Sequence, residues 1–355
     1  METSDFYQDY SLTSVQKNGY QCRYYRGVNN STHADLALFR YQGLLHYKSP
    51  PKKEPQQLAA FVASEPQTTL NPTDLSKWDG FFNYSITFLR EDEGSFSMFR
   101  RKLIKLHPTR TIHFASTLMR KPVKALWFVS HCTAAKKHNR IYSAREEYVI
   151  ELSKHISIDV FTSADKQVCF QRFKGLLNIH SNTKDPEIAD YMFYLSFENN
   201  LCKDYITEKL WKVLELNGTT IPVVLGGLSI KDYEAVAPPN SFVHVRNFTS
   251  PKELAEHLAH VSQDDNAFHY YHQWRNEYSV VHSQGWNKTK YSFYDNIIGY
   301  LCELLHKRPP RVNYNLSNDL SSKNCLIASS PSVYCPYYNL TCNSLPPIVD
   351  ANSTA

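Results

Sequence analysis

Short apolar runs divide the middle of the chain into segments of the length of buried strands. Four such runs lie at residues 123–130, 156–161, 191–197 and 221–225. They are too short for independent helices and are bounded by polar residues, as expected of strands in the interior of a sheet. We therefore predict a strand at each of the four positions.

Helical patterns separate these strands. Ser143 followed by Glu146 is the pattern of a capping box. Residues 205–216 have helical spacing and are followed by an Asn-Gly pair, which is typical of a helix end. A third helix is expected from Ser250, because a proline in the first turn and a glutamate three residues later follow it. Strands that alternate with helices predict a parallel, doubly wound α/β sheet.

The length of the chain predicts more than one domain. A single core stops growing at roughly 250–300 residues, and this chain has 355. Residues 34–118 contain short apolar runs between loops rich in Pro, Lys and Gln, and we predict a first domain there. Residues 119–307 form the predicted second domain. Residues 1–33 are polar and turn-rich, typical of a disordered or stem-like segment, and residues 308–355 are expected to be an irregular tail that contains cysteines.

Charge excludes one class of partner and leaves another open. The formal net charge is only +5, and basic residues are mixed with almost as many acidic ones. Nucleic-acid binding usually needs a basic arm or stripe, and the sequence has neither. A single bound anion, such as a nucleotide diphosphate, remains compatible with this charge.

Cysteines and glycosylation sequons indicate a protein of the secretory pathway. The eight cysteines form an even set without a Cys-x-x-Cys pair, which favours disulfides over a structural metal site, although their pairing stays open. Acceptor sequons for N-glycosylation occur throughout the chain. They lie at Asn30, Asn83, Asn217, Asn247, Asn287, Asn315, Asn339 and Asn352.

A polar constellation follows the third predicted strand. In an open α/β sheet, ligands bind at the carboxyl ends of the strands, where helix N-termini offer free N–H groups to anions. Tyr205, Glu208 and Lys209 have the spacing of one helix face, and Asn199 lies in the preceding loop. An aromatic ring, a carboxylate, an ammonium and an amide can together bind a sugar nucleotide. From spacing alone, however, a solvated Glu and Lys on an ordinary amphipathic helix is the favoured interpretation.

A longer motif changes that balance. Residues 191–211 resemble the donor-binding signature of the α1,3-fucosyltransferase family: an apolar strand, then Phe-Glu-Asn, a short gap and Asp-Tyr-Ile-Thr-Glu-Lys-Leu-Trp. The Pro-Val-Val-x-Gly strand of that signature is present at residues 222–226. The similarity covers most of residues 60–280 and is strongest after residue 190.

The resemblance implies a fold and a donor site. The implied fold is GT-B, with two Rossmann-like domains that face each other across a cleft, the first binding the acceptor and the second GDP-fucose. By position, Asn199, Tyr205, Glu208 and Lys209 correspond to the family's GDP-fucose contacts, and Arg145 to an arginine that approaches the diphosphate. These cations make a metal cofactor unnecessary, while Mn²⁺ or Mg²⁺ could act as a stimulator.

The resemblance also implies a catalytic base. Ser64-Glu65-Pro66 resembles the family's Glu-Ser-Pro turn, so Glu65 would deprotonate the acceptor hydroxyl. Proline directly follows this glutamate, and one residue of the family pattern is therefore lost. The alternative is a loop glutamate in water. The implied reaction is inverting transfer of L-fucose from GDP-β-L-fucose to the 3-hydroxyl of N-acetylglucosamine in a glycan.

Two other functions remain as alternatives to fucosyl transfer, and the family resemblance also implies a location. A catalytically silent glycan-binding homologue is one alternative, and a transferase that uses another sugar nucleotide is a second. Family members are usually anchored in the Golgi by one N-terminal membrane helix, which needs roughly 18 or more apolar residues. No such run occurs in this sequence. We expect either a truncated gene model or an enzyme that is soluble in the Golgi lumen.

Overall fold

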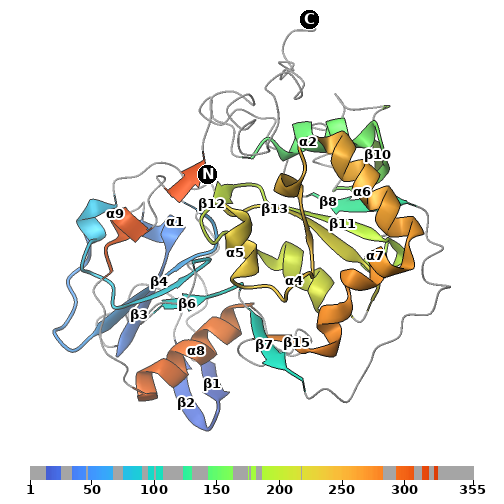
Figure 1. Ribbon diagram of the computed structural model, residues 1–355. Helices are drawn as coiled ribbons and strands as arrows, with labels where there is room; N and C mark the ends of the chain where they lie inside the picture. Colours follow the sequence, from blue (N-terminus) through green and yellow to red (C-terminus); the bar gives the residue numbers. More distant parts are fainter. Residues whose placement is uncertain are drawn as a thin grey trace, which may run out of the picture. The chain divides into compact units, whose positions relative to one another are not determined.

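The computed structural model divides the chain into two compact units (Figure 1). The first unit contains residues 1–100 and 282–321, and the second contains residues 101–281 and 322–355. The structure describes residues 13–24, 34–44, 47–66, 75–89, 95–99, 101–106, 123–129, 143–162, 175, 177–180, 186–216, 218–282, 293–307, 314–319 and 324–326.

The second unit is built on a six-stranded parallel sheet, and its strands occur in the order β10-β9-β8-β11-β13-β14. The two central strands β11 and β13 are buried along their whole length, as parallel strands covered on both faces should be. The four predicted strands are confirmed. The strands are β8 (Lys124–Phe128), β9 (Ser157–Phe161), β10 (Asn178–His180), β11 (Phe193–Phe197), β13 (Ile221–Leu225) and β14 (Val243–His244).

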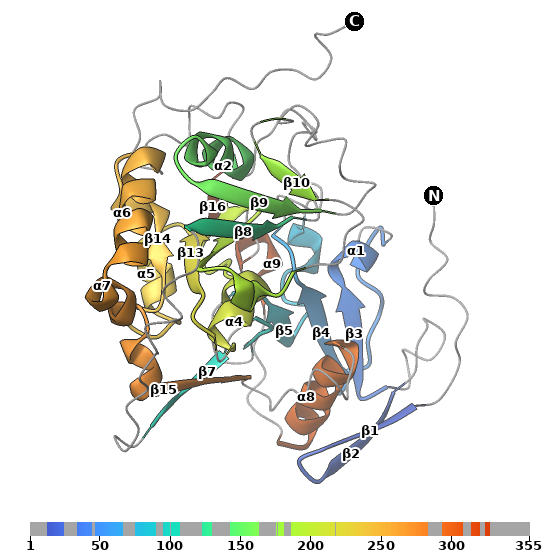
Figure 2. The same ribbon diagram turned by 90° about the vertical axis from the view of Figure 1, so that its right-hand side faces the viewer.

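Helices cover both faces of this sheet (Figure 2). Alternate residues of β8 and β11 pack with α2 (Arg145–Ser153) and α6 (Pro251–Gln263). The intervening residues, among them Leu126 and Tyr194, pack instead with Val213 of α4 (Glu208–Leu214). Because side chains alternate along a strand, this division shows that α4 lies on the opposite face from α2 and α6. Two short helices, α5 (Ile230–Glu234) and α7 (Asp265–Tyr270), complete the layers.

One predicted helix start is confirmed and another is wrong. Ser250 caps α6 by accepting a hydrogen bond from the Glu253 N–H, with proline at the first helical position. Ser143, in contrast, makes no cap, because α2 begins at Arg145 and its N-cap is Ala144. Ala144 has a left-handed backbone (φ 49°), an uncommon conformation for a non-glycine residue that the sequence pattern does not signal.

The first unit is also a parallel α/β layer. Its four-stranded sheet has the order β3-β4-β5-β6, and all neighbouring pairs are parallel. Both units thus confirm the expected α/β class with two Rossmann-like domains. The elements of the sheet and the short helices beside it are β3 (Leu36–Arg40), α1 (Tyr41–Leu44), β4 (Leu58–Ala63), β5 (Tyr84–Thr87), β6 (Ser95–Ser97) and α9 (Leu316–Asp319).

Helix α8 (Phe293–Lys307) belongs to the first unit, which differs from the predicted division at residue 307. Its residues Ile297, Leu301 and Leu304 share one apolar cluster with Ala60 of β4 and Ile86 of β5. The chain therefore returns to the first sheet after it has built the second. An amphipathic pattern predicts that a helix has a buried face, but it does not identify the sheet that this face covers.

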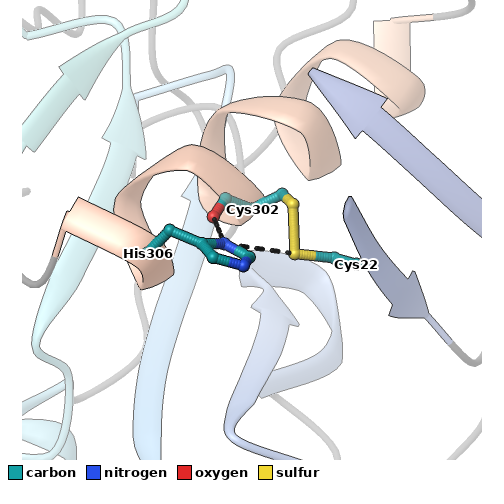
Figure 3. Close-up of a disulfide and its surroundings, with 3 residues drawn as sticks. All are labelled: Cys22, Cys302 and His306. Carbon is teal, nitrogen blue, oxygen red and sulfur yellow. Dashed lines mark hydrogen bonds between the residues drawn. A yellow bond between two sulfur atoms is a disulfide. The ribbon is translucent and has the colours of Figure 1, made fainter. Parts of the chain in front are cut away.

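The amino-terminal segment contains ordered structure, contrary to the expectation for residues 1–33. Strands β1 (Thr13–Lys17) and β2 (Tyr20–Tyr24) form an antiparallel hairpin. A disulfide joins Cys22 of β2 to Cys302 of α8 (Figure 3). A cross-link across 280 residues of sequence restricts the unfolded chain strongly and so favours the folded hairpin.

Four further strands complete the second unit. Strand β7 (Arg101–Lys105) pairs with β15 (Tyr278–His282), and β12 (Leu201–Cys202) pairs with β16 (Cys325–Leu326). A second disulfide links Cys202 to Cys325. The other four cysteines lie outside the described residues. Among the helices that the structure describes, none has the length and apolar character needed to cross a membrane.

Burial distinguishes the sequons at Asn83 and Asn247. The Asn83 side chain is 6% exposed, and its Oδ1 accepts hydrogen bonds from the Ala59 N–H (3.1 Å) and Lys53 Nζ (3.2 Å). Asn247 is exposed. We expect mass spectrometry of glycopeptides from protein secreted by eukaryotic cells to find a glycan on Asn247 and none on Asn83. A glycan on Asn83 in the folded fraction would contradict the burial seen here.

Candidate functional site

A buried carboxylate organises the carboxyl end of β11. Glu198 directly follows this strand, and its side chain is only 1% exposed. Its oxygens accept hydrogen bonds from the Thr207 N–H (2.7 Å), the Thr207 hydroxyl (2.9 Å) and Lys209 Nζ (2.8 Å). Lys209 Nζ also donates to Thr207 Oγ1 at 2.8 Å. A buried charge is stable only when it is paired in this way.

The helix expected from residue 205 begins later than predicted. Helix α4 starts at Glu208, so Tyr205 precedes it and does not share a helix face with Glu208 and Lys209. Asp204, which has a left-handed backbone (φ 62°), turns the chain just before this start. The sequence pattern did not reveal the turn. As a result, Lys209 points back to Glu198 while Glu208 is exposed.

Electrostatics keep Lys209 charged. Burial disfavours the ammonium ion, but the Glu198 and Glu208 carboxylates outweigh burial and raise the Lys209 pKa above its usual value. The Glu208 pKa is lowered, because the attraction to Lys209 overcomes the effect of desolvation. Lys209 Nζ lies 3.6 Å from the exposed Glu208 carboxylate. Lys209 is therefore a cation at neutral pH, with its side chain 20% exposed.

Arg145 brings a second cation to the same strand end. Its side chain is 4% exposed, and Nη1 donates to the carbonyl oxygen of Phe197, the last residue of β11, at 2.9 Å. The guanidinium also lies 5.6 Å from the Trp127 ring centre and pairs loosely with Glu146 at 3.4 Å. Its positive charge repels the Lys209 ammonium and so opposes part of the rise in the Lys209 pKa. The two cations therefore share one electrostatic environment.

Asn199 and Tyr205 form a hydrogen-bonded pair in the segment between Glu198 and Thr207. The Tyr205 hydroxyl donates to Asn199 Oδ1 at 3.0 Å. Tyr205 is 1% exposed, whereas Asn199 is half-buried and follows Glu198 directly. Four of the five residues predicted for the donor site therefore follow β11 in the chain. The fifth, Arg145, is the first residue of α2 and contacts the end of β11.

Glu198, Thr207 and Gly226 were not predicted as part of the site. A Cβ on Gly226 would lie 2.6 Å from Glu198 Cγ and 2.5 Å from the Tyr233 hydroxyl. Only glycine leaves room there for the buried carboxylate. Both Glu198 and Gly226 lie within the quoted motif, so the motif was the one available signal. The sequence does not show that this glutamate, rather than Glu208, is the direct partner of Lys209.

Glu65 lies in the first unit, two residues after β4, and is half-buried. Strand β4 is an interior strand of its parallel sheet, paired with β3 on one side and β5 on the other. Glu65 therefore lies at the carboxyl edge of the first sheet, the edge at which open α/β sheets generally bind ligands.

One possible metal-binding group is present among the described residues. Cys22, Cys302 and His306 offer ligand atoms that all lie within 4.8 Å of one another (Figure 3). The two sulfur atoms are joined in a disulfide, and metal ions bind the thiolate form of cysteine. In this state the group is a disulfide with a neighbouring histidine, and it lies in the first unit.

Several known fucosyltransferases have sequences similar to this chain. The α-(1,3)-fucosyltransferase fut-1 of Caenorhabditis elegans is 35% identical over 51% of this chain and 38% of its own length. Glycoprotein 3-α-L-fucosyltransferase A of Drosophila melanogaster is 38% identical over 47% of this chain and 30% of its own length. The bovine 3-galactosyl-N-acetylglucosaminide 4-α-L-fucosyltransferase FUT3 is 31% identical over 70% of this chain and 63% of its own length. The chain thus covers less than two thirds of each of these relatives.

A family model and a solved structure complete the comparison. A crystal structure of an α1,3-fucosyltransferase with GDP superimposes with a TM-score of 0.45 and 15% sequence identity, covering 78% of this chain and 79% of that one. The model of glycosyltransferase family 10 (fucosyltransferase), C-terminal part, matches residues 118–322, more than half of the chain. This segment contains the whole network around Glu198 and Lys209, and the chain therefore belongs to glycosyltransferase family 10, the fucosyltransferases.

Proposed function

We propose that this chain transfers L-fucose from GDP-β-L-fucose to the 3-hydroxyl of N-acetylglucosamine in a glycoprotein or glycolipid glycan, with inversion. The observation that carries the proposal is the pair of cations, Arg145 and Lys209, held by buried partners at the carboxyl end of β11. Cations fixed before substrate arrives stabilise the charge that develops on a leaving diphosphate. The names of the related proteins support fucose as the transferred sugar.

Lys209 has a donor group suited to a phosphate. An ammonium ion carries three N–H groups, and here Glu198 and Thr207 each accept one of them. The third can turn from the Glu208 carboxylate, 3.6 Å away, to a phosphate oxygen. Glu208 then keeps an exposed carboxylate that can accept hydrogen bonds from sugar or ribose hydroxyls. Asn199 offers an amide group to the donor, and the buried Tyr205 hydroxyl holds that amide in place.

The proposed reaction is a single displacement. Glu65 accepts the proton of the acceptor hydroxyl while that oxygen attacks the anomeric carbon of fucose. The bond from this carbon to the diphosphate oxygen breaks, and GDP leaves with the electron pair. Attack on the side opposite to a β-linked leaving group yields an α-fucoside. Because Arg145 and Lys209 supply the positive charge, the proposal requires no metal ion.

The proposed location is the Golgi lumen. Two disulfides join distant parts of the chain, one in each unit, and such bonds persist in the oxidising compartments of the secretory pathway. Co-staining of the full gene product with a Golgi marker tests this proposal, and a cytosolic distribution would contradict it.

The function is tested by measuring GDP release from GDP-fucose with an N-acetyllactosamine or core-glycan acceptor, in buffer containing EDTA. Acceptor-dependent release is expected. Measurable GDP binding without turnover would instead favour the catalytically silent glycan-binding homologue, which the altered turn at Glu65 makes the second candidate. Stronger competition by UDP than by GDP would indicate another sugar nucleotide.

Glu65→Gln is expected to lower kcat by about a hundredfold, the lower end of what a general base contributes, because glutamine keeps a hydrogen-bond acceptor but cannot take the proton. GDP affinity should not change, since Glu65 lies in the first unit and the donor residues in the second. Steady-state kinetics and GDP titration measure the two effects separately. An unchanged kcat would show that another group is the base.

A further inference from the structure

We propose that the disulfide between Cys202 and Cys325 positions the donor-binding residues of the second unit, acting through the segment Asn199–Tyr205, called here the donor loop. This inference rests on the proposed function, because it assumes that the loop contacts a GDP-sugar. It assigns a role in donor binding to the short carboxyl-terminal strand β16, which contributes none of the predicted site residues.

Strand β16 pairs with the middle of the donor loop. It pairs antiparallel with β12, so that Leu201 faces Leu326 and Cys202 faces Cys325. The pairing continues one residue further, where the Lys203 N–H donates to the Asn324 carbonyl at 2.9 Å. Backbone hydrogen bonds and a covalent bond thus act on the same three residues of the loop. A two-residue strand pair makes too few hydrogen bonds to be stable alone, and the disulfide supplies the missing constraint.

The two residues of the loop that are predicted to contact the donor, Asn199 and Tyr205, lie on either side of this pairing. The Tyr205 N–H donates to the Cys202 carbonyl at 3.1 Å, which ties Tyr205 directly to the cross-linked residue. The Tyr205 hydroxyl donates to Asn199 Oδ1 at 3.0 Å and so closes the loop from its other end. The position of the Asn199 amide therefore depends on Tyr205, and that of Tyr205 depends on Cys202.

The backbone between Cys202 and Tyr205 also needs outside support. Asp204 has a φ of 62°, in the left-handed region that non-glycine residues adopt uncommonly. Such a conformation persists when the surrounding structure fixes it. The disulfide and the Lys203–Asn324 hydrogen bond lie immediately before Asp204, and the Glu198–Thr207 network lies shortly after it. The turn is therefore fixed at both ends.

Loss of the disulfide should weaken donor binding while the sheet stays folded. Cys325 is separated from Cys202 by 123 residues, so β16 would pair with the loop only transiently once the covalent bond is gone. If the loop has the binding geometry for only a fraction of the time, the apparent Kd equals the intrinsic Kd divided by that fraction. The core beneath is formed by β11 and β13 with α2 and α6, and it includes Leu201 of the loop, with Leu326 packed against it, but neither cysteine. These apolar contacts hold the sheet together without the covalent bond.

The experiment uses the full chain with both cysteines replaced, Cys202→Ser/Cys325→Ser, and titrates it with GDP. The expected result is a Kd about tenfold higher, corresponding to a loop that is competent for about a tenth of the time. The KM for GDP-fucose should rise by a similar factor, while kcat changes less. The matched control is Cys22→Ser/Cys302→Ser, which removes the disulfide between β2 and α8 of the first unit. Its GDP Kd should stay within about twofold of wild type, because the two disulfides share no partners.

Hydrogen exchange separates a positioning role from a structural one. In the double variant, and in wild type under mild reduction, the Lys203 amide should exchange faster while the amides of β11 keep their protection. Loss of protection in β11 as well would overturn the inference, because the disulfide would then hold the whole unit together. An unchanged GDP Kd in the Cys202→Ser/Cys325→Ser variant would overturn it too. Failure of wild type to bind GDP would overturn the proposed function first, and this inference with it.

Discussion

Lys209→Ala is expected to lower kcat/KM for GDP-fucose by about a thousandfold, at the upper end of the effect of removing one charge-stabilising group from an active site. The variant loses both activity and stability. The diphosphate loses a cation, and Glu198, whose side chain is 1% exposed, is left without the ammonium that neutralises it. Breaking a buried ion pair by removing one partner costs about 3–5 kcal/mol of stability. Steady-state kinetics and urea unfolding measure the two losses.

A second variant separates these losses. Glu198→Gln/Lys209→Met replaces both charges with neutral side chains of similar size and should recover stability to within about 1–2 kcal/mol of wild type. Its turnover should stay as low as that of Lys209→Ala. Recovery of turnover would show that Lys209 acts only through the fold. Lys154→Met is the matched control, because Lys154 is exposed at the end of α2 opposite to Arg145 and pairs with Glu151 at 2.5 Å. GDP affinity should not change in this control.

The sheet of the second unit could be predicted from sequence because its signal is local. All five residues of β11 and of β13 are buried, and apart from Ser196 in β11 the two strands are runs of apolar and aromatic residues. The start of α6 was equally predictable, since its cap, its proline and its first acidic residue lie within four positions of one another. Such signals do not depend on the rest of the fold.

The start of α4 could not be predicted, because it is set by contacts with residues outside the helix. The Thr207 N–H is taken by Glu198 from the end of another element, and the turn at Asp204 is held beside a disulfide to residue 325. Helical spacing alone extends the helix to residue 205. The motif predicts which residues form the donor site, but their geometry depends on contacts that spacing does not contain.

Glu198 was overlooked for a related reason. A glutamate directly after a strand usually lies in water, and nothing near it in sequence indicates otherwise. Its burial depends on Gly226, which follows β13 and leaves space for the carboxylate. The role of Lys209 as a fixed cation thus depends on a residue without a side chain, on a different strand. Tertiary contacts of this kind also decided that α8 packs in the first unit rather than the second.

Acid is expected to destabilise the second unit well before the carboxylates titrate, because two of its histidines are buried in the neutral form. His244 is fully buried and His272 is 3% exposed. Burial, together with the charge of Arg246, lowers the pKa of His244 to about 3. For His272, burial is again the main cause, and its pKa falls to about 4. In the unfolded chain both should have a pKa of about 6.5.

The sign of the pH dependence follows from proton binding. Below pH 6.5 the unfolded chain protonates both imidazoles while the folded unit keeps them neutral, so the unfolded state binds more protons and stability falls as pH falls. Each pH unit costs about 1.36 kcal/mol per histidine. Stability should therefore depend little on these groups above pH 7.5 and should drop by about 4 kcal/mol between pH 7.5 and pH 5, with a further loss toward pH 4.

Urea unfolding at pH 7.5 and pH 5.0 measures this drop. The variant His244→Gln/His272→Gln should be less stable than wild type at pH 7.5, because both imidazoles are packed and each Nδ1 has a partner, the Arg246 N–H for His244 and the Phe268 carbonyl for His272. It should nevertheless lose much less stability than wild type on going to pH 5.0, since neither glutamine titrates. Equal losses in both proteins would mean that these histidines do not set the acid limit of the second unit.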